Sequence, residues 1–228
     1  MRAVLGDVSV DLVGISALAR YRVTARPPTL TRVPGPGTDV TFPLALVPGV
    51  VARRWQRVWA ERVRRPALEI VPVEDADQVA VLADGRARMT LARLPLTAAG
   101  GLAPDDLHVV RLYEERAVVL APRDHVLAAT EEGEAVEVAD VAEELFAPDD
   151  LPAGMPWSQR VALVAAGEGL LVAPHAVARA LQRKDLLWRA LEGAEPTTVA
   201  LVWPRADDDP LCQELVGIVR GRTARSSR

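Results

Sequence analysis

TFPLALVPGVVARRWQRVWAERVRRPALEIVPVEDADQVAVLADGRARMTLARLP, residues 41–95, alternates short apolar runs with amphipathic segments, and this alternation indicates the class of fold. Residues 42–47 are an apolar run short enough for a buried strand, and Pro48-Gly49 interrupts it. In residues 51–65 apolar side chains recur every three or four positions, which predicts a helix with one apolar face. Pro66 is expected to end that helix.

The same stretch continues with two more predicted strands. Residues 68–73 and 88–94 have the apolar character of buried strands, and a short helix is expected between them over residues 79–82, capped by Asp75 or Asp77. A β-α-β-α-β order of this kind is typical of parallel sheets with right-handed crossovers. The class of fold is therefore α/β.

Further elements are expected along the rest of the chain. Asp209-Pro210 is a strong start signal for a last helix, because an acidic cap and a proline at the first position both suit a helix N-terminus. The other expected strands are 107–112, 117–120, 170–172 and 197–203, and the other expected helices are 138–146, 158–166 and 175–182.

Composition limits the classes of function. The 228 residues are 50% hydrophobic and carry a net charge of −4, which argues against a nucleic-acid-binding protein. The single cysteine excludes an intrachain disulfide, and no apolar stretch reaches the roughly 18 residues of a membrane span. No signal-peptide core follows Met1, so a cytoplasmic protein is expected.

The two ends of the chain differ from the middle. Residues 1–40 include Pro27-Pro28 and a Pro-Gly run, so they are interpreted as an N-terminal arm or linker, or as a mis-assigned start. Residues 221–228 are interpreted as a basic, solvated tail, with a phosphate- or acid-binding arm as the alternative.

Three stretches carry a resemblance to a known family. They are LADGRARMTLARLP (82–95), LYEERAVVLAPRDHVLA (112–128) and LVAAGEGLLVAPHAVAR (163–179). In their order and spacing they resemble the effector-binding domain of LysR-type transcription regulators. The ending from Val199 is similar to short actinobacterial proteins with a LysR-like substrate-binding domain and no DNA-binding head.

The resemblance implies a type 2 periplasmic-binding-protein-like fold of two Rossmann-like lobes joined by two crossing strands. Lobe one would comprise residues 41–113 plus 197–220, and lobe two residues 114–196. The ligand would lie between the lobes, where strands of open α/β sheets end.

The chain departs from the family pattern in two places. The carboxylate of the family's GxxD motif is replaced by Arg88. Residues 1–40 show no two-helix pattern that could be a helix-turn-helix. Direct DNA binding by this chain is therefore not expected.

The first candidate site is the turn Pro48, Gly49 and Val50. It precedes the long helix, and backbone N–H groups at a helix N-terminus suit an anionic ligand. The alternative is an ordinary strand-to-helix turn.

The second group of candidates is expected to face the cleft. Arg93 leaves a strand just before Pro95 and could pair with a ligand carboxylate, or else with a neighbouring acid at the surface. Trp157 and Ser158 begin a helix and could frame a ring or a carboxylate, or else be a core aromatic and a helix cap. Glu114-Glu115 at the expected hinge is interpreted as solvated.

No catalytic, metal or cofactor site is expected. His108, His125 and His175 are far apart and have no companions at the spacing of metal ligands. Cys212 lies on the apolar stripe of the last helix and is interpreted as a buried hydrophobe.

Three hypotheses of function remain. The first is a ligand-sensing module for a small anionic effector, a carboxylate, whose output would pass through a homodimer or a heterodimer with a related regulator. The second is a pairing protein that modulates a complete regulator without a ligand, using the helix of Trp55 and Trp59, although core packing of these rings is favoured. The third is an enzyme, ranked last because no nucleophile or acid–base pair is visible.

Overall fold

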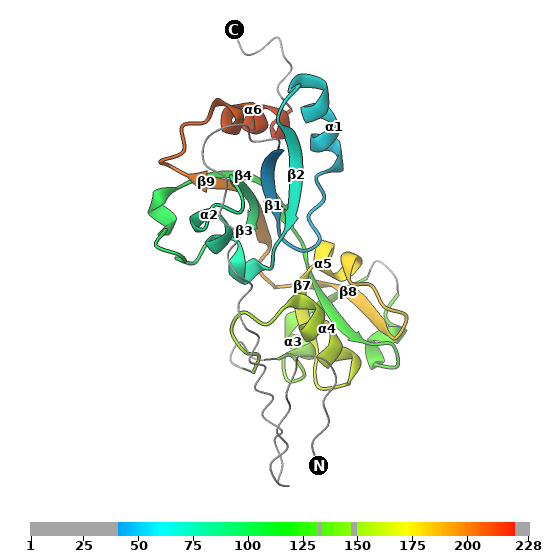
Figure 1. Ribbon diagram of the computed structural model, residues 1–228. Coiled ribbons are helices and arrows are strands. Elements are labelled where there is room, and N and C mark those ends of the chain that lie inside the picture. The colour runs from blue at the N-terminus through cyan, green and yellow to red at the C-terminus, as the bar shows by residue number, and fades with distance from the viewer. Residues whose placement is uncertain (1–40, 132–133, 147–149, 222–228) are drawn as a thin grey trace, which may run out of the picture. The chain divides into compact units, whose positions relative to one another are not determined.

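The computed structural model describes residues 41–131, 134–146 and 150–221, which form two β-sheets with helices packed against them (Figure 1). The expected arm at 1–40 and all but the first residue of the expected tail at 221–228 lie outside the described residues. Within the described part of the chain, no helix is long and apolar enough to cross a membrane.

The first sheet has five strands in the order β2-β1-β3-β9-β4. β1 pairs in parallel with β2 and β3, while β9 runs antiparallel to β3 and β4. The predicted parallel β-α-β-α-β unit is therefore present. The elements of this lobe, called lobe one from here on, are β1 (Thr41–Leu46), α1 (Arg53–Arg62), β2 (Ala67–Pro72), α2 (Ala80–Ala83), β3 (Met89–Arg93), β4 (Leu107–Glu115), β9 (Thr197–Pro204) and α6 (Pro210–Val219).

Helix α1 is shorter than the apolar pattern predicts. It begins at Arg53, so that Val51 lies outside it with 67% of its surface exposed, and it ends at Arg62 rather than at Pro66. The Trp59 indole donates a hydrogen bond to the carbonyl of Pro66 at 2.9 Å, which holds the segment after the helix against the core.

Two predicted helix caps have different outcomes. Asp209 caps α6 as predicted, because its carboxylate accepts from the Leu211 N–H at 2.9 Å. The cap predicted for the short helix is wrong: α2 starts after Val79 without a side-chain cap, and Asp75 lies in a separate 3-10 turn, Asp75–Asp77.

The second sheet has four strands in the order β6-β8-β5-β7. Its strand β8 was not predicted, because its sequence LLWRALE has no alternation of apolar and polar residues. The predicted helix 138–146 is reduced to one turn, since residues after Val141 form turns that lead to a bridge between Leu145 and Leu170. The elements of this lobe, called lobe two, are β5 (Ala117–Pro122), β6 (Ala135–Glu137), α3 (Val138–Val141), α4 (Trp157–Ala165), β7 (Leu171–Pro174), α5 (His175–Ala180) and β8 (Leu186–Glu192).

The chain passes between the two sheets twice, from β4 to β5 and from β8 to β9. The predicted class, an α/β fold of two lobes joined by two crossing segments, is confirmed. The lobe boundaries at residues 113 and 196 stay a prediction.

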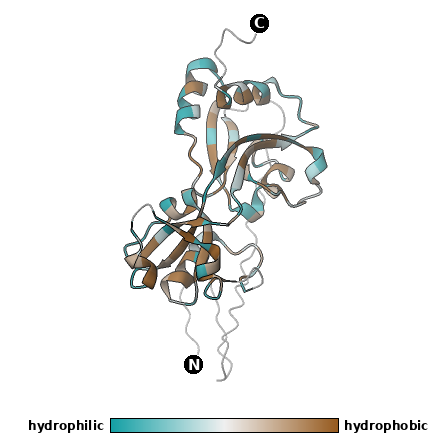
Figure 2. Cartoon of the chain, turned by 180° about the vertical axis from the view of Figure 1, so that it is seen from behind, coloured by the Kyte–Doolittle hydropathy of each residue, from teal (hydrophilic) through white to brown (hydrophobic). Residues whose placement is uncertain are grey.

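Each lobe has its own apolar core, and the strands are mostly hydrophobic in both (Figure 2). The largest fully buried side chain in lobe one is Trp59, whose ring centroid lies 5.0 Å from that of Phe42. In lobe two, Val118 and Leu120 face one helical layer while Val119 and Ala121 face the other side of the sheet. The central strand is therefore buried on both faces, as the apolar run predicts.

Candidate ligand site between the two lobes

Residues of both lobes line a cavity of about 540 Å³. Lobe one contributes the segment 74–78 and the end of β3 with the turn after it, and lobe two contributes the start of α4 and the end of β7. A cavity of this size is within the range of small-molecule sites. Its charged lining residues are Glu74, Asp75, Arg93, Arg160 and Glu195.

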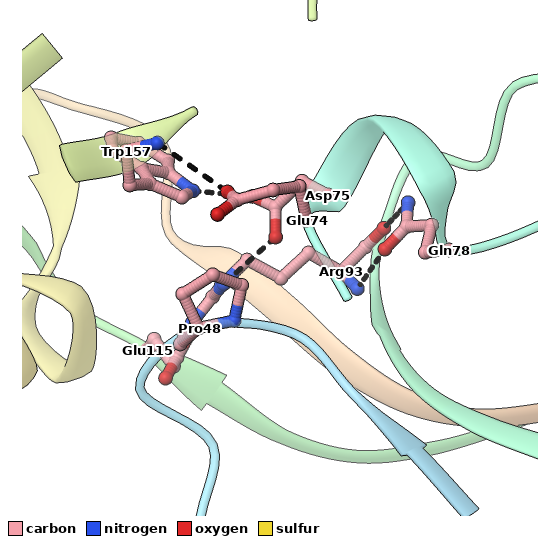
Figure 3. A network of polar contacts seen from close by, with 7 residues as sticks. All are labelled: Pro48, Glu74, Asp75, Gln78, Arg93, Glu115 and Trp157. Carbon is pink, nitrogen blue, oxygen red and sulfur yellow. Dashed lines mark hydrogen bonds and ion pairs between the residues drawn. The ribbon is translucent and has the colours of Figure 1, made fainter. Parts of the chain in front are cut away.

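Arg93 is the centre of a network of polar contacts at this cavity (Figure 3). Its side chain is only 4% exposed, and its Nε donates to Oε2 of Glu115 at 2.8 Å while Nη1 donates to Oδ1 of Asp75 at 3.0 Å. Nη2 donates to the carbonyl of Pro48 at 2.6 Å. The guanidinium is thus already paired with two carboxylates of the chain, and the pair with Glu115 is buried rather than at the surface.

The amide of Gln78 fixes the backbone at the same position. It accepts from the Arg93 N–H at 2.9 Å and donates to the Arg93 carbonyl at 2.8 Å (Figure 3). Buried polar groups of this kind need such partners, because an unpaired one loses the hydrogen bonds it had to water. The end of β3 is therefore joined by two hydrogen bonds to the segment 74–78 at the cavity.

The interpretation of Glu115 as a solvated hinge residue is wrong. It is the last residue of β4, its side chain is 5% exposed, and one of its oxygens, Oε2, accepts from Arg93. The other oxygen, Oε1, is buried without a partner among the described residues. Its neighbour Glu114 is exposed, as predicted.

Trp157 connects the two lobes. It is the first residue of α4, and its indole Nε1 donates to Oδ2 of Asp75 at 2.8 Å, while its backbone N–H donates to Oε2 of Glu74 at 3.4 Å (Figure 3). Carboxylates are stabilised at a helix N-terminus by the helix dipole and by free N–H groups. Glu74 of lobe one therefore contacts the backbone at the start of a helix in lobe two, and Asp75 contacts the side chain of the first residue of that helix.

Arg160 is a cavity residue that was not predicted from the sequence. It lies one turn after Trp157, with its guanidinium carbon 4.9 Å from the centre of the indole ring, and its Nε donates to the carbonyl of Met155 at 2.9 Å. It has no carboxylate partner within the described residues. The spacing of three residues between a tryptophan and an arginine at a helix start was the available signal.

The predicted site residues are thus only partly brought together. Arg93, Pro95 and Trp157 line the cavity between the lobes. Ser158 is exposed, does not line it and does not cap α4, whose cap position is Pro156.

The turn Pro48, Gly49 and Val50 lines a different cavity, of about 560 Å³, in which Glu74 also takes part. The Val50 N–H donates to the Val47 carbonyl at 3.2 Å, so it is not free for a ligand. Gly49 has a φ of +84° and lies against lobe two: a Cβ there would be 2.5 Å from the carbonyl carbon of Ala176. This turn is therefore a point of close contact between the lobes.

Arg88 stands where the family pattern has a carboxylate, and the structure gives it a role. It forms a two-point pair with Asp207 at 2.9 and 2.7 Å and reaches Asp209, the cap of α6, at 3.0 Å. The hydrogen bond and charge of Asp207 raise the pKa of the Arg88 guanidinium above its usual value. Arg88 thereby connects the start of β3 to the start of α6.

Two of the three histidines and the cysteine have structural surroundings. The ring centroids of His108 and Trp203 lie 4.8 Å apart with the rings tilted by 35°, and Nε2 of His125 lies 2.9 Å from Oε2 of Glu144. Cys212 is 1% exposed, and burial raises the pKa of its thiol to about 12. Within the described residues, no group of three or more potential ligands is placed to hold a metal ion.

The helix with the two tryptophans is packed into lobe one. Trp59 is 1% exposed, and Trp55 is partly buried against the same core. The core interpretation of Trp59 therefore holds, and a dimer through this helix stays a prediction.

Comparison with known proteins places this geometry in a class. No model of a protein family and no curated protein matches the chain. Among solved structures, the BenM effector binding domain with its effector benzoate is 17% identical over 82% of this chain and 93% of that chain, with a TM-score of 0.59. The oxidized form of OxyR is 18% identical over 82% of this chain and 98% of that chain, with a TM-score of 0.61.

A third similar structure is an H2O2-bound cysteine mutant of OxyR from Corynebacterium glutamicum, which is 17% identical over 80% of this chain and 67% of that chain, with a TM-score of 0.57. These neighbours are effector-binding domains of LysR-type regulators. The described residues have the fold of those domains, as the resemblance implies, and contain no helix-turn-helix head.

Proposed function

We propose that this chain is a small-molecule effector-binding module related to LysR-type regulators, with the effector in the cavity between the lobes. The observation that carries the proposal is the cavity of about 540 Å³, lined from both lobes in this fold. The BenM domain binds benzoate and an OxyR mutant is described with H2O2 bound, so the fold accepts small effectors.

The charges in the cavity favour an effector with one carboxylate. Arg93 is already neutralised by Glu115 and Asp75, so the guanidinium of Arg160 is the positive group left to pair with a ligand anion. A second anionic group would meet Glu74 or Glu195, and like charges repel at short range. Hydroxyl or N–H donors on the ligand would instead be accepted by these carboxylates.

The mechanism is a shift between states that differ in the contact of the lobes. The hydrogen bonds from Trp157 to Glu74 and Asp75 cross between the lobes next to the cavity. We call the state in which these hydrogen bonds are formed the contact state. A ligand that pairs with Arg160 and also touches lobe one shifts the population toward the contact state only if it binds that state more tightly than the state without these bonds.

The output of such a module goes through a protein partner. The chain's own second copy or a related complete regulator is the partner we propose, because DNA binding by this chain is not expected. We place the module in the cytoplasm, where such a regulator works and where the buried free thiol of Cys212 suits the reducing conditions.

Thermal unfolding against a panel of aromatic monocarboxylates, dicarboxylates and their neutral amides tests the proposal. An effector at about 100 times its Kd adds about 2.7 kcal/mol, which corresponds to a rise in Tm of about 5–11 °C for a domain of this size. Arg160→Gln should remove the shift, and Arg57→Gln on the exposed face of α1 should keep it. An equal shift in both variants would reject the cavity as the site.

A further inference from the structure

Lobe two contains a second, separate cavity of about 710 Å³. It lies between α5, the start of β8 and the turn after β5, and none of its lining residues lines the cavity between the lobes. Apolar side chains of the lobe-two core, Leu120, Ala178 and Leu186, form part of its wall. The cavity therefore belongs to one lobe.

The charged side chains that line this cavity are all basic. They are Arg123, Arg179, Arg183 and Arg189, and no aspartate or glutamate is among the lining residues. Arg183 is paired with Asp185 at 2.6 Å, and Arg189 donates to the carbonyl of Thr130 at 3.0 Å.

Arg123 and Arg179 are different. Within the described residues, neither guanidinium has a carboxylate or other side-chain partner, and both side chains are exposed. Two unneutralised guanidinium groups beside one cavity create a positive potential that attracts anions. Their planar donor groups match carboxylates and phosphates.

Aromatic side chains complete the cavity. The rings of His175 and Trp188 are 4.5 Å apart and both line it. The Nε2 of His175 is buried and has no hydrogen-bond partner among the described residues. A buried ring nitrogen without a partner is uncommon.

We propose that this cavity is a second ligand site, which takes a small planar ring bearing a carboxylate or a phosphate. The anionic group pairs with Arg123 and Arg179, and the ring packs beside Trp188 and His175. Because α5 also contributes the backbone that Gly49 of lobe one contacts, the bound ligand lies one turn of helix from a contact between the lobes.

Isothermal titration of the full chain with three probes tests the proposal: naphthalene-2-carboxylate, adenosine monophosphate and the uncharged naphthalene-2-carboxamide. We expect one of the two anions to bind with a Kd below about 1 mM and the amide to bind at least about tenfold more weakly. The double variant Arg123→Gln/Arg179→Gln should weaken the anion at least about tenfold.

The control is Arg53→Gln/Arg57→Gln, which removes the same charge from exposed positions of α1 in lobe one. It should leave the affinity unchanged, and so should Arg160→Gln, which alters only the cavity between the lobes. Loss of binding in Arg160→Gln would assign the probe to that other cavity and overturn the second site.

Two further outcomes would overturn it. One is that neither anion binds the parent chain with a Kd below about 1 mM. The other is that a single-stranded oligonucleotide binds far more tightly than adenosine monophosphate and loses affinity in the same double variant, which would make this surface a nucleic-acid site instead.

Discussion

Removal of the Arg93 side chain tests the network at the cavity most sharply. In Arg93→Ala, Glu115 keeps its buried position at 5% exposure but loses the guanidinium that pairs with it at 2.8 Å. Asp75 and the carbonyl of Pro48 lose a donor at the same time. Breaking one partner out of a buried ion pair leaves a buried charge without compensation, which destabilises a protein by about 3–5 kcal/mol.

This magnitude is large enough to measure by urea unfolding at neutral pH. In thermal unfolding it corresponds to a loss of about 6–20 °C in Tm for a domain of this size. The matched control is Arg57→Ala, an exposed arginine of α1, for which a change within about 0.5 kcal/mol is expected.

The paired substitution Arg93→Met/Glu115→Leu separates the buried charge from the other contacts. Because apolar residues of similar volume can replace a buried ion pair at little net loss, it should recover most of the stability lost in Arg93→Ala. A loss below about 1 kcal/mol in the single variant, or no recovery in the double variant, would refute the assignment of a buried pair at this site.

Three other predictions concern stability and reactivity. Gly49→Ala should destabilise the chain by more than about 3 kcal/mol, because the new Cβ lies 2.5 Å from Ala176 and the backbone is strained at a φ of +84°. Gly85→Ala has only the backbone strain, at a φ of +73° and with nothing within 4 Å of the new Cβ, and should cost about 1–2 kcal/mol. Urea unfolding of the two variants measures the difference. Cys212, with a thiol pKa of about 12, should not react with a disulfide reagent at pH 8 until the chain is unfolded, and fast labelling of the native chain would contradict this burial of the thiol. Because the thiol pKa in the folded chain is raised above its value of 9.0 in the unfolded chain, the free energy of unfolding should fall as the pH rises above 9. Asp209→Ala should remove the cap of α6 and lower the free energy of unfolding by about 0.5–2 kcal/mol, while an unchanged value would show that the cap contributes nothing.

The regular part of the fold was predictable because apolar periodicity reports directly on burial. Residues 42–47 and 68–73 are apolar for the length of a strand, and both form strands of the first sheet. The capped start of α6 was predictable for a similar reason, since Asp209-Pro210 acts within one turn of the chain.

The missed parts depend on contacts distant in the sequence. Glu115 has the composition of a solvated residue and is buried only because Arg93, which lies 22 positions earlier, faces it. Asp75 was expected to cap a local helix and instead contacts Trp157, which lies 82 positions later. No local pattern encodes such a partner.

The position of the candidate site was predictable, but the pairing of its charged residues was not. Arg93 and Trp157 were expected at a cleft that the family resemblance implied, and both line the cavity. What the sequence could not show is that Arg93 is already paired, so that Arg160 is the group available to an anion.

An effector that binds between the lobes must touch both of them. Hydrogen–deuterium exchange of the chain, with and without the carboxylate found in the unfolding panel, measures this contact. We predict added protection in residues 74–78 and 93–97 of lobe one together with residues 153–160 of lobe two, the segments that line the cavity. Protection confined to a single lobe, or spread evenly over the chain, would contradict a site between the lobes.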